Sequence, residues 1–519
     1  MKLYRSFATV GGMTMLSRVL GFVRDILIAA VLGTGMVADA YFVAFRFPNL
    51  FRRLFAEGAF NAAFVPLFAK RLEGEGAAEA RDFAEQALAV LVAALLVTTA
   101  LAELAMPWLM YLIAPGFADW PEKFELAVLL TRIAFPYLLF VSLVALLSGL
   151  LNALGRFALA AAAPTLLNVV LIAVLTSIAW AGWGDTPQAG VAITWGVAAA
   201  GLLQFAVLGI WAWRVGFGLK LRRPRLTPAV RRLVRLGIPG VIAGGITQIN
   251  ILIGTIIASL QDSAVSWLYY ADRIYQLPLG IVGIAIGVVL LPELSKQLRT
   301  GDDEGAIASL NRSLEFSLLL TLPAAVALLV VPGPIIQVLF ERGAFSADDT
   351  PATAMALAAF AVGLPAFVLI KVFSPAYFAR EDTRTPMIYA GASVIVNVLG
   401  SIALFLLIGH VGIAAATSLA GWVNAGLLAL TLRRRGAYVL DGRMSRRMRP
   451  LLASSVIMGA FLWAAAAGLG GSFAPANGLA VQAGALGALV LGGLIVYGAA
   501  CQLTGAARLR SLLANVVGG

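Results

Sequence analysis

Two long apolar stretches near the start of this chain contain arginines at positions that a lipid-facing helix could not tolerate. The stretches read MTMLSRVLGFVRDILIAAVLG and MVADAYFVAFRFPNLFRRLF, and their arginines include Arg18, Arg24, Arg46 and Arg52. A guanidinium near the middle of a bilayer costs roughly 2.5–3.5 kcal/mol on insertion scales. We therefore expect these side chains to face water, a partner charge or an anionic ligand.

The composition is that of an all-α polytopic membrane protein. Of the 519 residues, 61% are hydrophobic and 12% are charged, whereas soluble domains are about 45–50% apolar and about 25% charged. Segments of about 20 apolar residues recur along the whole chain. The single cysteine, Cys501, excludes a disulfide framework and a thiolate metal cluster. The single histidine, His410, falls in a predicted external turn, where we expect it on the surface.

The hydropathy pattern predicts about fourteen transmembrane helices. Several prolines fall inside them and are expected to kink or break the helices: Pro48, Pro136, Pro239, Pro278 and Pro365. The predicted spans are 7–33, 37–69, 83–113, 126–153, 158–180, 189–213, 232–260, 263–295, 312–340, 352–379, 385–408, 411–433, 450–470 and 480–505.

The loop charges predict the orientation of these spans. Residues 214–235 and 433–449 are dense in arginine and lie on the same side, whereas the opposite links GWGDTPQ and LQDS are poor in Lys and Arg. By the positive-inside rule we expect both termini to be cytoplasmic. The net charge of +12 is thereby explained by topology, and we expect no nucleic-acid partner.

An internal repeat is indicated by residues that match at an offset of roughly 222–229 positions. The matching sets are Pro66, Lys70 and Leu72 with Pro292, Lys296 and Leu298, and Pro136 and Asn168 with Pro365 and Asn397. Six spans per repeat give both halves the same orientation, with a cavity at their interface. We expect an N-terminal lobe over 1–218, a C-terminal lobe over 219–440, and two additional helices over 441–519.

Charged residues within the spans fall on defined helix faces. In the first span Arg18 and Asp25 are seven residues apart and share a face; in the second, Asp39, Arg46 and Arg53 repeat at the same spacing. In the eighth span, polar side chains at a 3–4–3 spacing form one face, with Asp272 beside it: Ser266, Tyr269, Arg273 and Gln276.

Some of these charges have a structural interpretation. Arg53 and Glu57 are expected to pair within one helix, and Arg132 and Glu103 are expected to snorkel or lie near an interface. Asp25 and Asp39 cannot neutralise the remaining arginines, so the residual positive electrostatic field should attract an anion. Arginine forks match phosphate oxygens in bidentate geometry, which predicts a diphosphate ligand.

These residues resemble a known family. SRVLGFVRD, ADAYFVAFRFPNLFRRLFAEGAFNAAFVPLF, and SWLYYADRIYQLPLG with LLPELSK are similar to the bacterial lipid II flippases called MurJ or MviN. That family belongs to a superfamily that also contains multidrug antiporters and polysaccharide-precursor flippases. The resemblance runs the length of the chain, including the last two spans.

The resemblance implies two six-helix lobes around a central cavity, with the two extra helices forming a groove for a polyprenyl tail. It implies alternating-access transport of the undecaprenyl-diphosphate-linked peptidoglycan precursor to the outer leaflet. The substrate-binding residues that it implies are Arg18, Arg24, Arg52 and Arg273. Supporting or gating roles fall to Asp25, Asp39, Ser266, Gln276 and Arg53. Our hypothesis is that Arg24 and Arg273, from opposite lobes, clamp the diphosphate.

One departure concerns energy coupling. Several members have a glutamate where this chain has Gln276, so a carboxylate role there is in doubt. A cation site proposed for the family would draw on Asn250, Asn397 and Thr417, without a carboxylate. The sequence leaves a coupling cation and the membrane potential open, and it predicts no cofactor or resident metal.

Two other functions are alternatives for a polytopic membrane protein of this kind. A multidrug antiporter of the superfamily would favour an acidic cavity, which the surplus of arginine disfavours. A membrane enzyme acting on lipid-linked sugars would need catalytic carboxylates or a metal near one face, and the sequence offers neither. We expect a monomeric transporter without enzymatic activity, whose partners are the lipid-linked diphosphate-sugar-peptide and membrane lipids; a related flippase for another lipid-linked oligosaccharide stays an alternative.

Overall fold

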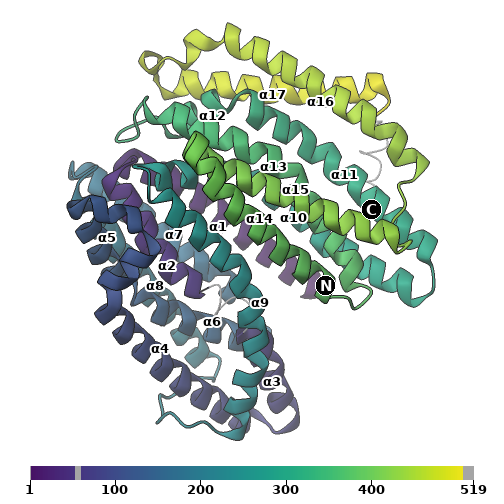
Figure 1. Ribbon diagram of the computed structural model, residues 1–519. Coiled ribbons are helices and arrows are strands. Elements are labelled where there is room, and N and C mark those ends of the chain that lie inside the picture. The colour runs from purple at the N-terminus through teal and green to yellow at the C-terminus, as the bar shows by residue number, and fades with distance from the viewer. Residues whose placement is uncertain (1, 53–59, 507–519) are drawn as a thin grey trace. The chain divides into compact units, whose positions relative to one another are not determined.

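A computed structural model describes residues 2–52 and 60–506 of the chain. Within these ranges, the side chains of some helical and turn residues are outside the description: 2–8, 47, 51, 52, 61, 62, 240–244, 246, 247, 284–289 and 475. The described residues form helices joined by turns and loops, without a strand (Figure 1).

By packing, the chain divides into two units. Unit 1 comprises 1–266 with 342–345, and unit 2 comprises 267–341 with 346–519. The helices within unit 1 are α1 (Lys2–Leu32), α2 (Met36–Arg52), α3 (Phe60–Gly74), α4 (Ala77–Ile113), the 3₁₀ helix η2 (Pro115–Asp119), α5 (Pro121–Ala134), α6 (Tyr137–Ala153), α7 (Phe157–Trp180), α8 (Pro187–Arg214) and α9 (Pro228–Ala258).

Unit 2 contains the second half of the helices. They are α10 (Ala264–Arg299, whose first turn belongs to unit 1), α11 (Asp303–Val330), α12 (Pro332–Phe340), α13 (Asp349–Phe378), α14 (Arg384–Ile408), α15 (His410–Arg434), α16 (Gly442–Gly468), the 3₁₀ helices η3 (Gly470–Phe473) and η4 (Pro475–Asn477), and α17 (Gly478–Thr504). Helices α16 and α17, coloured yellow-green to yellow, pack side by side (Figure 1).

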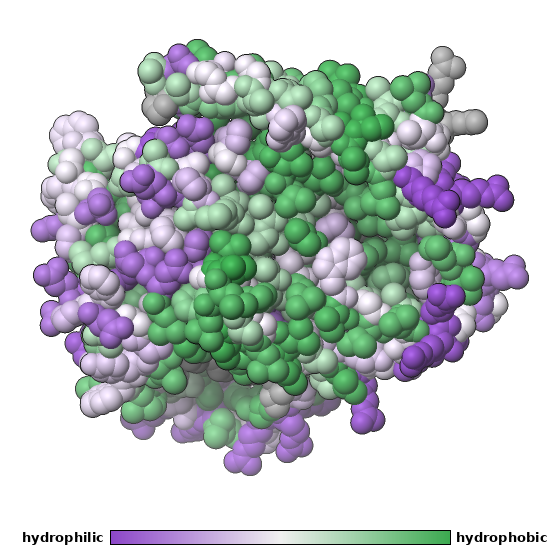
Figure 2. Space-filling view, turned by 45° about the horizontal axis from the view of Figure 1, so that its top comes forward, coloured by the Kyte–Doolittle hydropathy of each residue, from purple (hydrophilic) through white to green (hydrophobic). Residues whose placement is uncertain are grey.

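The expected all-α membrane fold is confirmed at the level of the helices. Among the described residues, ten segments are long and apolar enough to cross a membrane: α4, α5 with α6, α7, α8, α11, α13, α14, α15, α16 and α17. Helices α1, α2, α3, α9 and α10 overlap other predicted spans but are not among these ten. Figure 2 shows that hydrophobic side chains cover broad areas of the face in view and that hydrophilic ones gather toward its margins.

Helix starts and breaks follow local chemistry. Thr227 caps α9 by accepting a hydrogen bond from the Val230 N–H, and Pro228 occupies the first helical position. Pro136 separates α5 from α6, as predicted, since proline lacks an N–H and disturbs the preceding turn. The other four prolines singled out in the sequence lie inside continuous helices.

Unit 1 is a bundle in which α1 packs on α7, α2 on α5, and α6 and α7 on α8. Helix α9 packs on α3 and α4, and unit 1 therefore extends to residue 266. The short segment 342–345 joins this unit because the Ala344 N–H donates to the Ala30 carbonyl over 2.8 Å. Gly343 allows the approach, since a Cβ there would lie 2.1 Å from that carbonyl oxygen.

Unit 2 is centred on α13 and α15, with α14 on α15 and α11 on α13. Helix α16 packs on α11 and is held there by ion pairs of Glu315 with Arg443 and Arg447. An apolar groove of about 210 Å³ lies among α11, the start of α12, α16 and α17, and its lining includes Pro323, Leu462 and Leu489.

Close backbone packing in unit 1 is testable at Gly116 of η2. A Cβ at this position would lie 2.1 Å from the Ser259 carbonyl oxygen in the turn after α9. We expect Gly116→Ala to lower the free energy of unfolding by about 1–3 kcal/mol, because such a contact forces the backbone to shift. Thermal unfolding in detergent measures the effect.

The matched control for that experiment is Gly209→Ala in α8, where a Cβ would meet nothing within 4 Å. This change should leave the stability unchanged or raise it by up to about 1 kcal/mol, because alanine favours the helix more than glycine does. Equal effects of the two substitutions would contradict the packing explanation.

Candidate functional site

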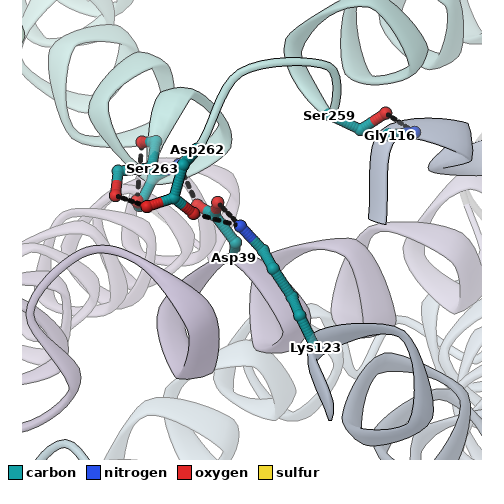
Figure 3. Close-up of polar contacts among 7 residues, drawn as sticks. Asp39, Gly116, Lys123, Ser259, Asp262 and Ser263 are labelled. Carbon is teal, nitrogen blue, oxygen red and sulfur yellow. Dashed lines mark hydrogen bonds and ion pairs between the residues drawn. The ribbon is translucent and has the colours of Figure 1, made fainter. Parts of the chain in front are cut away.

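A buried charged cluster of unit 1 contains Asp39. This residue lies in the first turn of α2 and is 0% exposed. One carboxylate oxygen accepts the backbone N–H of Ser266 at 2.8 Å, and the other accepts the Lys123 ammonium at 2.7 Å (Figure 3). Asp39 thereby connects α2 to α5 and to the beginning of α10.

Lys123 is the centre of this cluster. Its side chain is 4% exposed and contacts two carboxylates, those of Asp39 and Asp262 at 2.7 and 2.8 Å. The ammonium also lies 4.6 Å from the centre of the Phe117 ring. Lys123 and Asp262 were not predictable from the sequence. Lys123 is 84 residues from Asp39 and 139 residues from Asp262, and no local spacing relates them.

Asp262 occupies the turn between α9 and α10 and has a different environment. Its side chain is 59% exposed. Burial of part of the carboxyl raises its pKa, but the hydrogen bond and positive charge of Lys123 outweigh this effect and hold the pKa below its usual value. Its contribution to stability is present above the unfolded pKa and is lost as the pH falls through the lower folded pKa.

Ser266 belongs to the same cluster. It is 0% exposed, and its hydroxyl donates to the Ser263 carbonyl at 2.9 Å while its N–H is bonded to Asp39. The sequence placed Ser266 on a polar face with Arg273 and Gln276. In the structure Ser266 lies in the first turn of α10, and Gln276 is exposed and donates to Asp272.

Arg24 is held in unit 1 by two residues. It is 9% exposed; its Nε and Nη2 donate to Asp25 Oδ1 at 3.1 and 2.7 Å, and its Nη1 donates to Asn168 Oδ1 at 2.9 Å. Asn168, on α7, donates in turn to the Ser17 carbonyl at 2.8 Å. These contacts fix the guanidinium on the α1–α7 interface, with Asp25 as the counter-ion.

Arg18 has a different environment. The sequence placed it on one face with Asp25, but Asp25 pairs with Arg24, and Arg18 is exposed. Among the residues that the structure describes, Arg18 has no hydrogen bond or ion pair. Arg46 donates to Thr255 and so ties α2 to α9. The Arg52 side chain and all of Arg53 and Glu57 lie outside the described residues.

Arg273 is placed by α10 in unit 2. The residue is half-buried, and its guanidinium carbon lies 4.6 Å from the centre of the Tyr269 ring. A cation over an aromatic face is stabilised by the ring quadrupole. Tyr269 therefore restricts where this arginine points.

The residues of the expected cation site are divided between the units. Asn250 lies on α9 in unit 1, and Asn397 and Thr417 lie on α14 and α15 in unit 2. The Asn397 Oδ1 accepts hydroxyl hydrogen bonds from Thr417 at 3.2 Å and Ser401 at 3.5 Å. Within the described ranges no group of three or more His, Cys, Asp or Glu side chains is arranged to hold a metal.

Two further expectations concern Arg132 and His410. Arg132 and Glu103 line an open groove of about 650 Å³ on unit 1 that is otherwise apolar. His410 is 5% exposed, so the prediction of a surface residue is wrong. His410 is the first residue of α15, and its side chain packs inward: its ring lies 4.8 Å from the Trp267 ring, and its Nε2 is 2.9 Å from the Ala352 carbonyl oxygen.

The buried ion pair can be tested at Lys123. Lys123→Met leaves the Asp39 carboxylate buried without its counter-ion, and we expect a loss of about 3–5 kcal/mol in the free energy of unfolding. Asp262→Asn should cost about 0–1 kcal/mol, since that partner is largely in water. Detergent unfolding curves measure both.

A double-mutant cycle provides the control. Combining Lys123→Met with Asp39→Asn removes both charges, so the loss should be much smaller than the sum of the two single losses. Additive losses would contradict a direct interaction of the pair.

Comparison with known proteins identifies the family. Residues 28–481 match the family model described as lipid II flippase MurJ. A protein of Rhizobium meliloti (strain 1021) named probable lipid II flippase MurJ is 51% identical over 520 residues, covering 100% of this chain and 97% of that protein. The lipid II flippase MurJ of Burkholderia cenocepacia is 38% identical over 84% of this chain and 85% of its own.

Solved structures with a similar fold include a member of this family. A structure described as lipid II flippase MurJ in an inward closed conformation matches with a TM-score of 0.78 and 25% identity, covering 97% of this chain and 99% of its own. A multidrug resistance transporter of the MATE family, in its inward-facing conformation, shares the fold at a TM-score of 0.65 and 15% identity, covering 82% of this chain and 97% of its own. The chain belongs to the lipid II flippase MurJ family.

Proposed function

We propose that this chain is a lipid II flippase. It moves the undecaprenyl-diphosphate-linked peptidoglycan precursor from the cytoplasmic to the periplasmic leaflet of the bacterial inner membrane by alternating access. A diphosphate carrying sugar and peptide cannot cross hydrocarbon unaided, because an ion loses its hydration there. The protein supplies a polar path for the headgroup, while the lipid tail stays in the bilayer.

The observation that carries this proposal is the buried Arg24 within an apolar helix. Asp25 and Asn168 hold the guanidinium in place, and an arginine fork recognises phosphate in bidentate geometry. A preorganised arginine loses little side-chain entropy when the ligand binds. We assign Arg24 and Arg273 to direct contact with the diphosphate, and Arg18 and Arg52 to attraction of the headgroup.

The remaining polar residues support this step. Asp25 orients Arg24. Asp39, with Ser266, stabilises one conformation of the transporter through the cluster at the start of α10. Gln276, bonded to Asp272, serves as a neutral polar residue, and Arg53 contributes to the positive field. The apolar groove among α11, α12, α16 and α17 accommodates the polyprenyl tail.

Membrane potential supplies the driving force in this proposal. It acts on moving charge with roughly 2.3 kcal/mol per elementary charge per 100 mV. A coupling cation is the second candidate for the driving force. It ranks second because the Asn397 and Thr417 side chains already hydrogen-bond one another and because Gln276 offers no carboxylate. Both termini are cytoplasmic, and the chain acts as a monomer that transports its substrate without chemical conversion.

Arg24 and Arg273 are the residues to test first. We expect Arg24→Ala and Arg273→Ala each to slow translocation by about ten- to a hundredfold, because losing a charge-assisted hydrogen bond costs about 1.5–3 kcal/mol. Complementation of a strain depleted of its precursor flippase, with the precursor assayed at the outer leaflet, measures this. Intact translocation in both variants would refute the assignment.

Arg24→Lys and Arg273→Lys are the matched controls. They keep the charge but lose the bidentate fork, so translocation should be restored only in part. A drug-efflux assay on the same strains separates the alternative of a multidrug antiporter. Turnover of the headgroup by purified protein would instead indicate an enzyme.

Ion replacement tests the driving force. In proteoliposomes, exchanging sodium for choline should leave translocation unchanged, and dissipating the membrane potential should slow it. Translocation by the Asn397→Ala variant should likewise still depend on the membrane potential. A strict requirement for sodium that Asn397→Ala removes would favour the cation-coupled alternative.

A further inference from the structure

The connection between α8 and α9, residues 215–227, is held tightly against α3 and α4. Phe217 is 8% exposed, and its ring meets the edge of Phe68 at 5.8 Å between centres. The Arg81 guanidinium lies 5.5 Å over the Phe217 ring and donates to the Gly216 carbonyl. We call residues 215–227 the linker strap.

Two acidic residues of α4 complete this attachment. Glu85, which is 2% exposed, accepts the Lys220 N–H at 3.1 Å and pairs with the Arg222 Nε at 2.5 Å. Asp82 pairs with the Arg222 Nη1 at 2.6 Å. The strap is therefore a fixed part of unit 1, and binding there would cost little ordering entropy.

The strap and the first turns of α9 display more cations than these acids can balance. Six side chains are exposed and, within the described part of the chain, have no ion pair or side-chain hydrogen bond: Lys220, Arg223, Arg225, Arg231, Arg232 and Arg235. The first turn of α9 contains no acidic residue. A dense, uncompensated positive surface of this kind attracts an anionic partner.

Exposed apolar side chains lie among these cations. Leu221 is 67% exposed and Leu226 is 57% exposed, and Val234 and Leu236 of α9 are exposed as well. Apolar side chains that contact only water do not stabilise the surface on which they lie. Alternating cations and leucines are typical of segments that lie in a membrane interface, with the apolar side chains at the acyl boundary.

Trp213 indicates that the strap lies at this depth. It is 72% exposed near the end of α8, where interfacial tryptophans anchor a helix. Gly218 packs on it so closely that a Cβ there would lie 2.9 Å from the indole. The strap therefore turns back to the level of the interfacial aromatic residue, which favours a lipid surface over a soluble protein.

We propose that the linker strap and the start of α9, residues 218–236, form a docking surface for anionic phospholipids of the cytoplasmic leaflet. The six cations contact lipid phosphates, and Leu221 and Leu226 enter the upper acyl region. Each basic residue near an anionic surface contributes about 1 kcal/mol. The proposal rests on the membrane orientation given under the proposed function, but not on the identity of the transported lipid.

The test uses the full-length protein in nanodiscs of phosphatidylcholine alone or mixed with phosphatidylglycerol. Hydrogen–deuterium exchange reports on the amides of residues 218–236. We expect exchange there to slow severalfold when phosphatidylglycerol is present, and this protection to weaken at high salt, because salt screens exposed charges. Equal exchange in both membranes overturns the proposal.

A charge variant and a matched control sharpen the result. Arg223→Gln, Arg225→Gln, Arg231→Gln and Arg232→Gln together should abolish the response to phosphatidylglycerol. The control removes four exposed arginines of unit 2, with Arg433→Gln, Arg434→Gln, Arg446→Gln and Arg449→Gln, and should keep the response. Loss of the response in both variants would indicate a general charge effect and also overturn the proposal.

A third variant tests the apolar part. Leu221→Ser with Leu226→Ser should speed exchange of the strap in both membranes, because less of it enters the interface. Translocation measured on the same samples separates this proposal from the flippase assignment. If the strap responds to lipid charge but the protein does not translocate lipid II, the docking proposal stands and only the proposed substrate is refuted.

Discussion

The ion pair between Lys123 and Asp39 is the interaction on which the arrangement of unit 1 depends. Both side chains are almost fully buried, and a buried charge that loses its partner is strongly destabilising. The pair therefore requires α5 to stay on α2, and the Asp39 bond to the Ser266 N–H requires the first turn of α10 to stay with them.

Polar contacts of the same kind place the residues proposed for function. Arg24 is tolerated inside an apolar helix because Asp25 balances its charge and Asn168 accepts a further hydrogen bond. The linker strap is likewise held by ion pairs. Glu85 and Asp82 neutralise Arg222, and the other cations of the strap stay available for the membrane surface. Apolar helices provide the frame, and a small number of buried charges fix their relative positions within each unit.

Most of the helices were predictable from the sequence, because helix formation depends on local features. Runs of apolar residues predicted the spans, and the break between α5 and α6 falls at Pro136 as expected. The local sequence does not distinguish Pro136, where a helix breaks, from Pro239, Pro278 and Pro365, which lie within continuous helices. Neighbouring helices decide whether a proline ends a helix, since they can stabilise the backbone groups that proline leaves unpaired.

The sequence by itself determined that this chain is a helical membrane protein, which family it resembles, and which arginines are too costly to face lipid. Those conclusions follow from composition, hydropathy and short motifs. Only the tertiary structure decided which charges meet: Asp25 pairs with Arg24 rather than Arg18, Lys123 joins Asp39 to Asp262, and His410 is buried. These partners come from helices far apart along the chain, and pairing at such separations depends on how the helices pack.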